Sequence, residues 1–337
     1  MSENNITKKP PFLEVRDLTV EYTSGGEVIH AVNGVSFSLE KGKTLGLVGE
    51  TGAGKTTIAK SILRILPDRS ASIRGGEINI DGENLLALKE PEMRKIRGKK
   101  ISMVFQDPMT ALNPVQRVGQ QIAEVIKNHG SVRDKATLEK KAKEMLELVG
   151  IPADRYYEYP HQFSGGMKQR VVIAIALACN PDLLLADEPT TALDVTIQAQ
   201  VLDLIENLKR ERKTAMVMIT HDLGVVATVC DEVAVIYAGS IVEYGTKEQI
   251  FDHPTHPYTI GLFASIPDIS TDREWLYHIE GLPPDPANLP EGCSFNPRCP
   301  YACDSCRQGV VDLHQTPDGH VCRCINIQKV LDKGVMV

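Results

Sequence analysis

The stretch TLGLVGETGAGKTTIAKSI, residues 44–62, decides the fold. Its first five residues form an apolar, partly β-branched run that predicts a buried strand, and its last residues begin a helix-forming run. The loop between them, GETGAGKT, has the GxxxxGK[ST] spacing of a phosphate-binding loop, in the strand–loop–helix context that this spacing requires. A glycine-rich turn without a ligand is the alternative, and the flanking strand and helix argue against it. We therefore predict an α/β fold with a nucleotide site at this loop.

The residue types in this loop suit a phosphate chain. Glycines allow successive backbone N–H groups to turn inward around phosphate oxygens, and a helix N-terminus favours negative charge. Lys55 is expected to reach the β- and γ-phosphates, and Thr56 to supply a hydroxyl to Mg²⁺. The predicted nucleotide-binding residues of the loop are Gly49, Glu50, Thr51, Gly52, Ala53, Gly54, Lys55, Thr56 and Thr57.

Two acidic residues follow a second apolar run, LLLADEPT at residues 183–190. The run predicts a buried strand, and ligands of open α/β sheets bind at the edge where such strands end. Asp187 is expected to hold Mg²⁺ through water, and Glu188 to polarise an attacking water. A helix cap is the alternative interpretation of the acidic pair. A third run, TAMVMITHD at residues 214–222, ends in His221, which could contact a γ-phosphate.

The segment FSGGMKQR, residues 163–170, predicts a second anion site. Ser164, followed by Gly165 and Gly166, begins a helical stretch, so a hydroxyl, flexible backbone amides and a helix dipole coincide there. Because the chain already has one phosphate loop, we interpret this segment as serving the nucleotide of another molecule.

Composition and charge exclude several classes of protein. The 337 residues are 42% hydrophobic and 24% charged, which argues for packed units and against disorder. The formal net charge of −7 disfavours a broad basic surface for nucleic acid. The N-terminus lacks the features of a secretory signal, and the longest apolar run, residues 171–179, is much shorter than the about 20 residues of a membrane span. The sequence therefore predicts a soluble, cytosolic chain with no transmembrane segment of its own.

Together these motifs resemble the ATP-binding subunit of an ABC transporter. GETGAGKT is similar to the Walker A motif of that family, and LLLADE to its Walker B motif with Glu188 as the catalytic carboxylate. FSGGMKQ resembles the signature motif, although Phe163 and Met167 replace the commonest Leu and Gln. The resemblance also identifies four residues by position: Gln106 as the Q-loop residue, Asp194 as the end of the D-loop, His221 as the switch histidine and Tyr22 as the aromatic that stacks on adenine.

The resemblance implies a mechanism. Two ATP-binding subunits close head to tail over two ATP molecules, each held between one subunit's Walker A motif and the other's signature at Ser164–Gly166. Glu188 is then the base that activates water, and His221 holds that water and the γ-phosphate. Hydrolysis reopens the dimer and moves the membrane subunits. The implied Mg²⁺ ligands are Thr56, Gln106 and, through water, Asp187.

The chain divides into four predicted parts. Residues 12–106 form the first part of the nucleotide-binding core with an antiparallel β subdomain, and residues 107–169 form a helical subdomain that carries the signature. Residues 170–250 complete the core. Residues 251–337 are a C-terminal extension, whose prolines predict an irregular chain that needs a staple. The fold implied by the resemblance is a P-loop NTPase of the ABC ATPase type with an irregular, metal-binding C-terminal extension.

Six of the eight cysteines lie between Cys293 and Cys324. Structural disulfides are rare in a reducing compartment, where clustered cysteines more often bind metal. Cys303 and Cys306 have CxxC spacing, and with Cys322 and Cys324 they could bind zinc. An iron–sulfur cluster also needs four thiolates. Spacing alone does not separate zinc from iron–sulfur, and free thiols are a further alternative.

A second resemblance narrows this choice. HPYT, GCSFNPRC and GHVCRC are similar to the C-terminal extension of dipeptide and oligopeptide importer ATPases, some of which bind a [4Fe–4S] cluster there. The pattern leaves Cys303 and Cys322 without counterparts, so their roles stay open, and zinc remains the alternative metal. The cluster ligands implied by position are Cys293, Cys299, Cys306 and Cys324.

The predicted function is therefore ATP hydrolysis that powers the import of dipeptides or oligopeptides. The implied partners are a second, homologous ATPase subunit in a heterodimer, two transmembrane permease subunits and an extracytoplasmic peptide-binding protein. The implied location is the cytoplasmic face of the cell membrane. A nickel importer of the same group is one alternative. A soluble ABC ATPase of DNA repair or translation is another, disfavoured by the single cassette and the acidic balance, and we predict no nucleic-acid partner.

Overall fold

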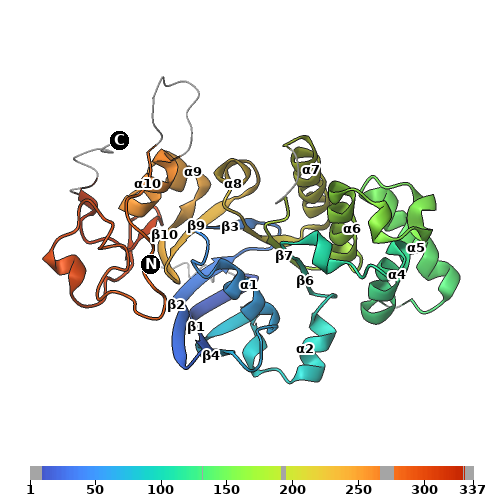
Figure 1. Cartoon of the computed structure of the whole chain (residues 1–337), viewed down its shortest axis with the longest axis horizontal. Helices are drawn as coiled ribbons and strands as arrows, with labels where there is room; N and C mark the ends of the chain where they lie inside the picture. The colour runs from blue at the N-terminus through green and yellow to red at the C-terminus, as the bar shows by residue number, and fades with distance from the viewer. Residues whose placement is uncertain (1–9, 131, 191–194, 266–276, 329, 331–337) are drawn as a thin grey trace, which may run out of the picture.

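The computed structural model describes residues 10–130, 132–190, 195–265, 277–328 and 330 of the chain. An eight-stranded sheet crosses the middle of the molecule (Figure 1). In spatial order its strands are β11 (His314–Gln315), β12 (Val321–Cys322), β10 (Ser240–Thr246), β9 (Glu232–Tyr237), β3 (Thr44–Val48), β8 (Ala215–Ile219), β7 (Leu183–Asp187) and β6 (Ile101–Val104). The run from β9 to β6 pairs in parallel, whereas β10, β12 and β11 continue the sheet in antiparallel pairs.

A second, antiparallel sheet lies next to the first. Its spatial order is β2 (Glu27–Leu39), β1 (Leu13–Ser24), β4 (Ala71–Ile80) and β5 (Glu83–Asn84), followed along the chain by η1 (Leu85–Ala87) and α2 (Glu90–Ile96). Ile58 and Ile62 of α1 (Lys55–Leu63) share one hydrophobic core with strands of both sheets. The antiparallel strands predicted within residues 12–43 are thus confirmed as β1 and β2.

The central strands are apolar along their whole length because both faces of the sheet are covered. In β8, Met216 and Met218 face the core beneath α6 (Gly165–Leu177), α7 (Val195–Arg212) and α8 (Leu223–Val229), whereas Val217 and Ile219 face the core that contains α1. Parallel strands buried on both faces have such continuous apolar sequences. The short apolar runs of the sequence therefore mark the middle of the sheet.

A group of helices between β6 and β7 lies at the end of the molecule opposite the C-terminal extension (Figure 1). Val118, Ile122 and Ile126 repeat every four residues along one side of α4 and bury that side. None of the helices within the described ranges is long and apolar enough to span a membrane. The elements of this part are α3 (Pro108–Ala111), α4 (Val118–His129), α5 (Lys135–Leu148), η2 (Ala153–Tyr157), η3 (Pro160–Gln162) and the start of α6.

The C-terminal extension is docked on the nucleotide-binding core. It includes α10 (Pro257–Ala264) and η4 (Asp304–Arg307), and the predicted boundary at residue 250 falls within α9 (Lys247–Asp252). The sequence predicted irregular chain here, but β12 pairs with β10 and adds two short strands to the main sheet. The physical reason is that β10 would otherwise leave a sheet edge with unpaired N–H and C=O groups.

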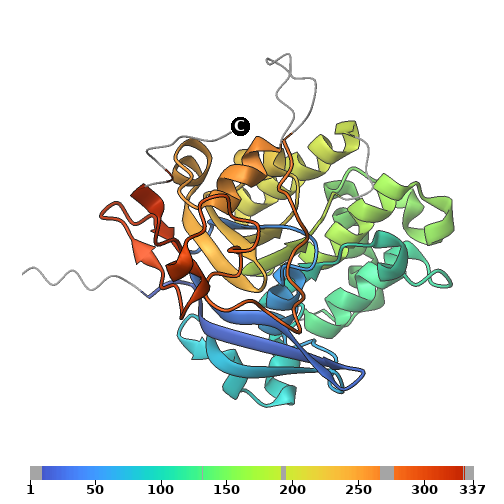
Figure 2. The ribbon, with the colours of Figure 1, turned by 60° about the vertical axis from the view of Figure 1, so that its left-hand side comes forward.

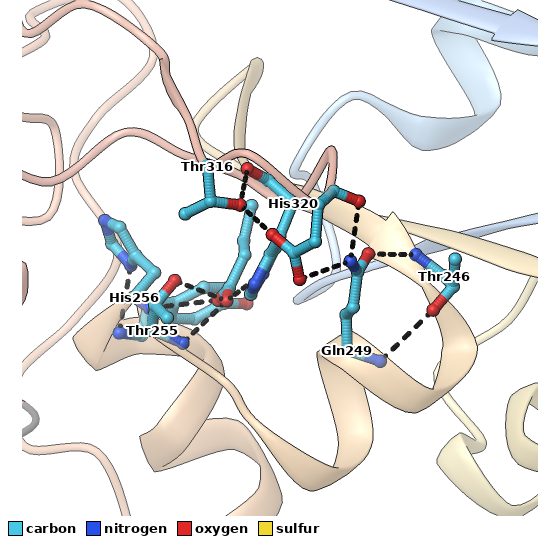
Figure 3. Close-up of polar contacts among 9 residues, drawn as sticks. Thr246, Gln249, Thr255, His256, Thr316 and His320 are labelled. Atoms are coloured by element: carbon cyan, nitrogen blue, oxygen red, sulfur yellow. Dashed lines mark hydrogen bonds and ion pairs between the residues drawn. The ribbon is translucent and has the colours of Figure 1, made fainter.

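A buried carboxylate fixes the extension to the sheet. Glu243 of β10 is 0% exposed and accepts hydrogen bonds from the backbone N–H and hydroxyl of Thr255 at 2.6 and 2.8 Å. The backbone N–H of His256 donates at 3.0 Å, and Nε2 of His320 lies 2.8 Å away. Figure 3 shows Thr255 and His256 of one segment facing His320 of another. Burial alone would raise the pKa of Glu243, but hydrogen bonds led by that of His320 outweigh it and hold the pKa below its usual value.

We expect Glu243→Gln to lower the free energy of unfolding by about 3 kcal/mol, because the substitution removes one charge of a buried pair and points amide hydrogens at existing donors. Urea unfolding followed by circular dichroism measures the effect. Glu147→Gln, at an exposed position on α5, is the matched control and should unfold at the wild-type urea concentration. Equal midpoints for the two variants would contradict the role of Glu243.

Candidate nucleotide site

The glycine-rich loop before α1 lines an open cavity of about 800 Å³ at the carboxyl edge of the parallel strands. Apart from Ala31 of β2, every residue of this lining was predicted from the sequence. Gly49, Glu50, Tyr22 and Asp187 were predicted for the same site but do not belong to the lining. The lining residues are Ala31, Thr51, Gly52, Ala53, Gly54, Lys55, Thr56, Thr57, Gln106, Glu188 and His221.

Two of the loop's glycines are required by the backbone around them. A Cβ atom on Gly54, whose φ is 103°, would lie 2.3 Å from the carbonyl oxygen of Ala31. A Cβ atom on Gly49, whose φ is 149°, would lie 2.1 Å from the carbonyl oxygen of Ile236. Because only glycine tolerates these positions, the loop can pass close under β2 and β9 and still begin α1 at Lys55.

Lys55 is held against the loop itself. Its Nζ atom donates to the carbonyl oxygens of Gly49 at 2.6 Å and Glu50 at 2.9 Å, and the residue is only 7% exposed. Burial lowers the pKa of Lys55, and the nearby charge of Glu188 opposes that shift. The loop therefore holds the ammonium group of a lysine that lines the cavity.

An oxygen pair lies beside this lysine. The hydroxyl of Thr56 donates to Oδ1 of Asp187 at 3.1 Å, and Asp187 is 3% exposed. Burial raises the pKa of Asp187, and the hydrogen bond from Thr56 opposes that shift. A hydroxyl next to a carboxylate offers the hard oxygen ligands that Mg²⁺ prefers.

The carboxylate of Glu188 lies between residues from two neighbouring strand ends. Nε2 of Gln106, after β6, donates to Oε2 of Glu188 at 2.8 Å, and Nδ1 of His221, after β8, lies 3.2 Å from Oε1. Glu188 has a φ of 48°, a left-handed conformation that costs about 1–3 kcal/mol in a non-glycine residue. Its backbone N–H donates to Ile219 at 2.8 Å, and this bond helps to hold the turn that aims the carboxylate into the cavity.

Other predicted site residues lie elsewhere. Ser164–Gly166 begins α6, with the Ser164 hydroxyl accepting from the backbone N–H of Met167 at 3.4 Å, and it does not line the cavity of its own chain. The hydroxyl of Tyr22 shares a 3.3 Å hydrogen bond with that of Thr57. Asp194 lies outside the described residues.

Sequence reasoning missed the residue that binds Glu50. The carboxylate of Glu50 forms an ion pair with Arg298 of the C-terminal extension at 2.9 Å. Arg298 immediately precedes Cys299, and its position between two cysteines was the only signal that could have drawn attention to it.

Four cysteines of the extension line a second, smaller cavity. Cys322 is not part of that lining, and the Sγ atom of Cys303 lies 3.5 Å from that of Cys306. Burial raises the pKa of Cys299 to about 12 and that of Cys324 to about 11. Within the described part of the chain, no three His, Cys, Asp or Glu side chains meet closely enough to hold a metal ion. The cysteines that line the cavity are Cys293, Cys299, Cys306 and Cys324.

Comparison with known proteins adds to this geometry. A family model described as "ABC transporter" matches residues 32–191, and one described as "Oligopeptide/dipeptide transporter, C-terminal region" matches residues 242–306. The oligopeptide transport ATP-binding protein OppD of Bacillus subtilis is 51% identical over 90% of this chain and 84% of its own length. The chain belongs to the ATP-binding proteins of ABC transporters. This confirms the resemblance to the ATP-binding subunit of an ABC transporter that the motifs indicated.

Other members of the ABC transporter family give the same result. The dipeptide transport ATP-binding protein DppD of Bacillus subtilis is 49% identical over 93% of each chain. OppD of Escherichia coli is 48% identical over 87% of each chain. A solved dimeric ATP-binding cassette in a post-hydrolysis state, bound to ADP and Pi, superposes with a TM-score of 0.63 at 28% identity, covering 70% of this chain and 98% of that one. The ABC ATPase fold is therefore shown.

Proposed function

We propose that this chain hydrolyses ATP to power the import of dipeptides or oligopeptides through an ABC transporter. The observation that carries this proposal is the carboxylate of Glu188, which Gln106 and His221 contact in a cavity that the phosphate loop also lines. The names of the relatives, which are oligopeptide and dipeptide transport ATP-binding proteins, support the substrate class.

The residues around the loop fit ATP with Mg²⁺. Lys55 would exchange the carbonyl oxygens of Gly49 and Glu50 for β- and γ-phosphate oxygens, which carry more negative charge. Thr56 and Gln106 would bind Mg²⁺ directly, and Asp187 would do so through water. When bound with ATP, the ion neutralises charge on the phosphate oxygens.

Glu188 is the proposed general base. A water on the cavity side of its carboxylate would donate a proton to Glu188 as it attacks the γ-phosphate. His221 would hold that water and the γ-phosphate, and Gln106 would orient the carboxylate through the hydrogen bond described above. Tyr22, whose hydroxyl is tied to Thr57 beside the phosphate loop, would stack its ring on the adenine.

The signature motif supports a two-subunit site. The N-terminus of α6, at Ser164–Gly166, can bind phosphate through its free amides, yet it does not line the cavity of its own chain. We infer that it closes over the ATP of a second, homologous ATPase subunit, as the motif resemblance implies. The predicted D-loop residue Asp194 would belong to the same interface.

The proposed assembly contains two transmembrane permease subunits and an extracytoplasmic peptide-binding protein. This ATPase would then be peripheral, at the cytoplasmic face of the cell membrane. The acidic net charge of −7 agrees with a partner other than nucleic acid.

Co-purification of the tagged chain from detergent-solubilised membranes tests the assembly. We expect it to recover a second ATPase and two membrane proteins with several spans each, because the proposed partners are integral to the bilayer. Recovery with ribosomes or DNA, and with no membrane protein, would contradict a transport function.

Glu188→Gln should reduce steady-state ATP hydrolysis by at least about 100-fold, because the amide cannot accept the proton of the attacking water. ATP binding, measured by equilibrium dialysis, should persist. Glu211→Gln, at an exposed position on α7, is the matched control and should hydrolyse ATP at the wild-type rate. An unchanged rate in Glu188→Gln would refute the assigned base.

We further propose that the extension binds a [4Fe–4S] cluster through Cys293, Cys299, Cys306 and Cys324. These four thiols line one cavity, which is the donor set that such a cluster needs. A bound cluster supplies cross-links between segments that have little regular structure.

Anaerobic purification with iron and sulfide assays tests this proposal. Cys299→Ser should lose the iron and the brown colour, because a cluster needs each of its thiolates. Cys322→Ser replaces a buried cysteine outside the cavity lining and should keep both. A colourless wild-type protein that contains zinc and no iron would contradict the cluster.

A further inference from the structure

The C-terminal extension contacts the phosphate loop at Glu50. Nη1 of Arg298 donates to Oε2 of Glu50 at 2.9 Å, and Nη2 donates to Oε1 at 3.1 Å. This two-pronged arrangement is the strongest geometry for an arginine–carboxylate pair. The side chain of Arg298 is only 5% exposed and that of Glu50 is 27% exposed, so the arginine end of the pair is largely shielded from water.

A second residue of the extension holds the backbone at the same point. The hydroxyl of Tyr258, at the start of α10, accepts a hydrogen bond from the backbone N–H of Glu50 at 3.0 Å. Tyr258 is fully buried, and its ring packs against those of Tyr237 and Phe295 at centroid distances of 4.6 and 5.4 Å. This packing of aromatic rings fixes the position of the Tyr258 hydroxyl.

Glu50 passes this restraint to the lysine of the loop. Its carbonyl oxygen accepts from Nζ of Lys55 at 2.9 Å, so one residue is bound by its N–H, its carboxylate and its carbonyl. A rotation of the Glu50 peptide would move the starting position of the ammonium group. Arg298 and Tyr258 prevent that rotation from outside the cavity.

The same part of the extension is anchored around this point. Arg298 also donates to the carbonyl oxygens of Ile279 and Glu280, and the backbone N–H of His30 in β2 donates to Pro286 at 2.9 Å. His30 precedes Ala31, which lines the nucleotide cavity. In Figure 2 the orange-to-red segment after α10 runs down to the blue strands of the smaller sheet, in agreement with this contact.

We propose that Arg298 and Tyr258 are positioning residues for ATP binding: the extension holds Glu50, and Glu50 fixes the backbone of the phosphate loop and the position from which Lys55 moves to the phosphates. The proposal rests on the ATPase function proposed above. Neither residue touches the nucleotide cavity, so each acts through Glu50. The extension is thereby a working part of the nucleotide site.

Equilibrium binding of ATP to the purified chain, measured by calorimetry, tests the proposal. Arg298→Ala and Tyr258→Phe should each raise the Kd for ATP by about tenfold, the change expected when a hydrogen bond to a charged or buried group is lost. At saturating ATP, kcat should stay within about twofold of wild type, because Glu188 and His221 are untouched. A general loss of structure would lower kcat as well.

Four further variants separate positioning from folding. Arg298→Lys keeps the positive charge but cannot form the two parallel hydrogen bonds of the guanidinium group. Its Kd for ATP should therefore lie between those of wild type and Arg298→Ala. Glu50→Gln should raise the Kd as Arg298→Ala does, and the double variant should be no worse than either single one, because both remove the same ion pair. Arg307→Ala is the matched control, since Arg307 lies in the same extension with 56% of its side chain exposed, and it should bind ATP as wild type does.

The outcomes distinguish this inference from the proposed function. A wild-type chain that does not bind ATP overturns both. A wild-type chain that binds ATP, with Arg298→Ala and Tyr258→Phe binding within about twofold of it, overturns the positioning role alone. If Arg298→Ala does not fold, the Kd values of Tyr258→Phe and Arg298→Lys test the positioning role instead, because both variants keep most of the buried contacts.

Discussion

The parallel pairing of β3 with β8 on one side and β9 on the other is the constraint on which the nucleotide site depends. Ile219 at the end of β8 pairs with Leu47 of β3 and with Asp187 of β7, so three neighbouring strands end at the same level. Loops that leave parallel strands at one edge must converge there. This register brings together side chains that are far apart in the sequence: Lys55, Gln106, Glu188 and His221.

The parts of this site that could be predicted from the sequence are those whose signal is local. The apolar run, the glycines and the lysine of the phosphate loop are adjacent in the chain, and the acids after LLLA follow a strand that the run itself reveals. The partner of the Glu50 side chain is an example of what such local signals cannot predict. The loop motif predicted Glu50 as a nucleotide-binding residue, and it gave no sign that the carboxylate faces Arg298, because the partner of a side chain depends on tertiary packing that spacing does not encode.

The extension was harder to predict for the same reason. Its prolines predicted irregular chain, and most of it has no regular structure, yet a two-residue strand completes the sheet edge opposite Glu243. A strand of two residues is too short to have a recognisable alternation of apolar and polar residues. The buried pair of Glu243 with His320 adds little net attraction, since desolvation offsets much of it, but removing one partner leaves the other buried group unpaired. Such a pair fixes one docking position for a segment that also packs Tyr258 and Phe295 into the core.

The ion pair between Arg298 and Glu50 joins residues that are 248 positions apart. A ribosome makes proteins from the N-terminus, and domains tend to fold in that order. The phosphate loop is therefore synthesised first, whereas the arginine that contacts it is added 248 residues later. A nascent or prematurely terminated chain can carry every motif of the ATPase core and still lack this contact. The order of synthesis thus delays completion of the nucleotide site until the C-terminal extension has been made.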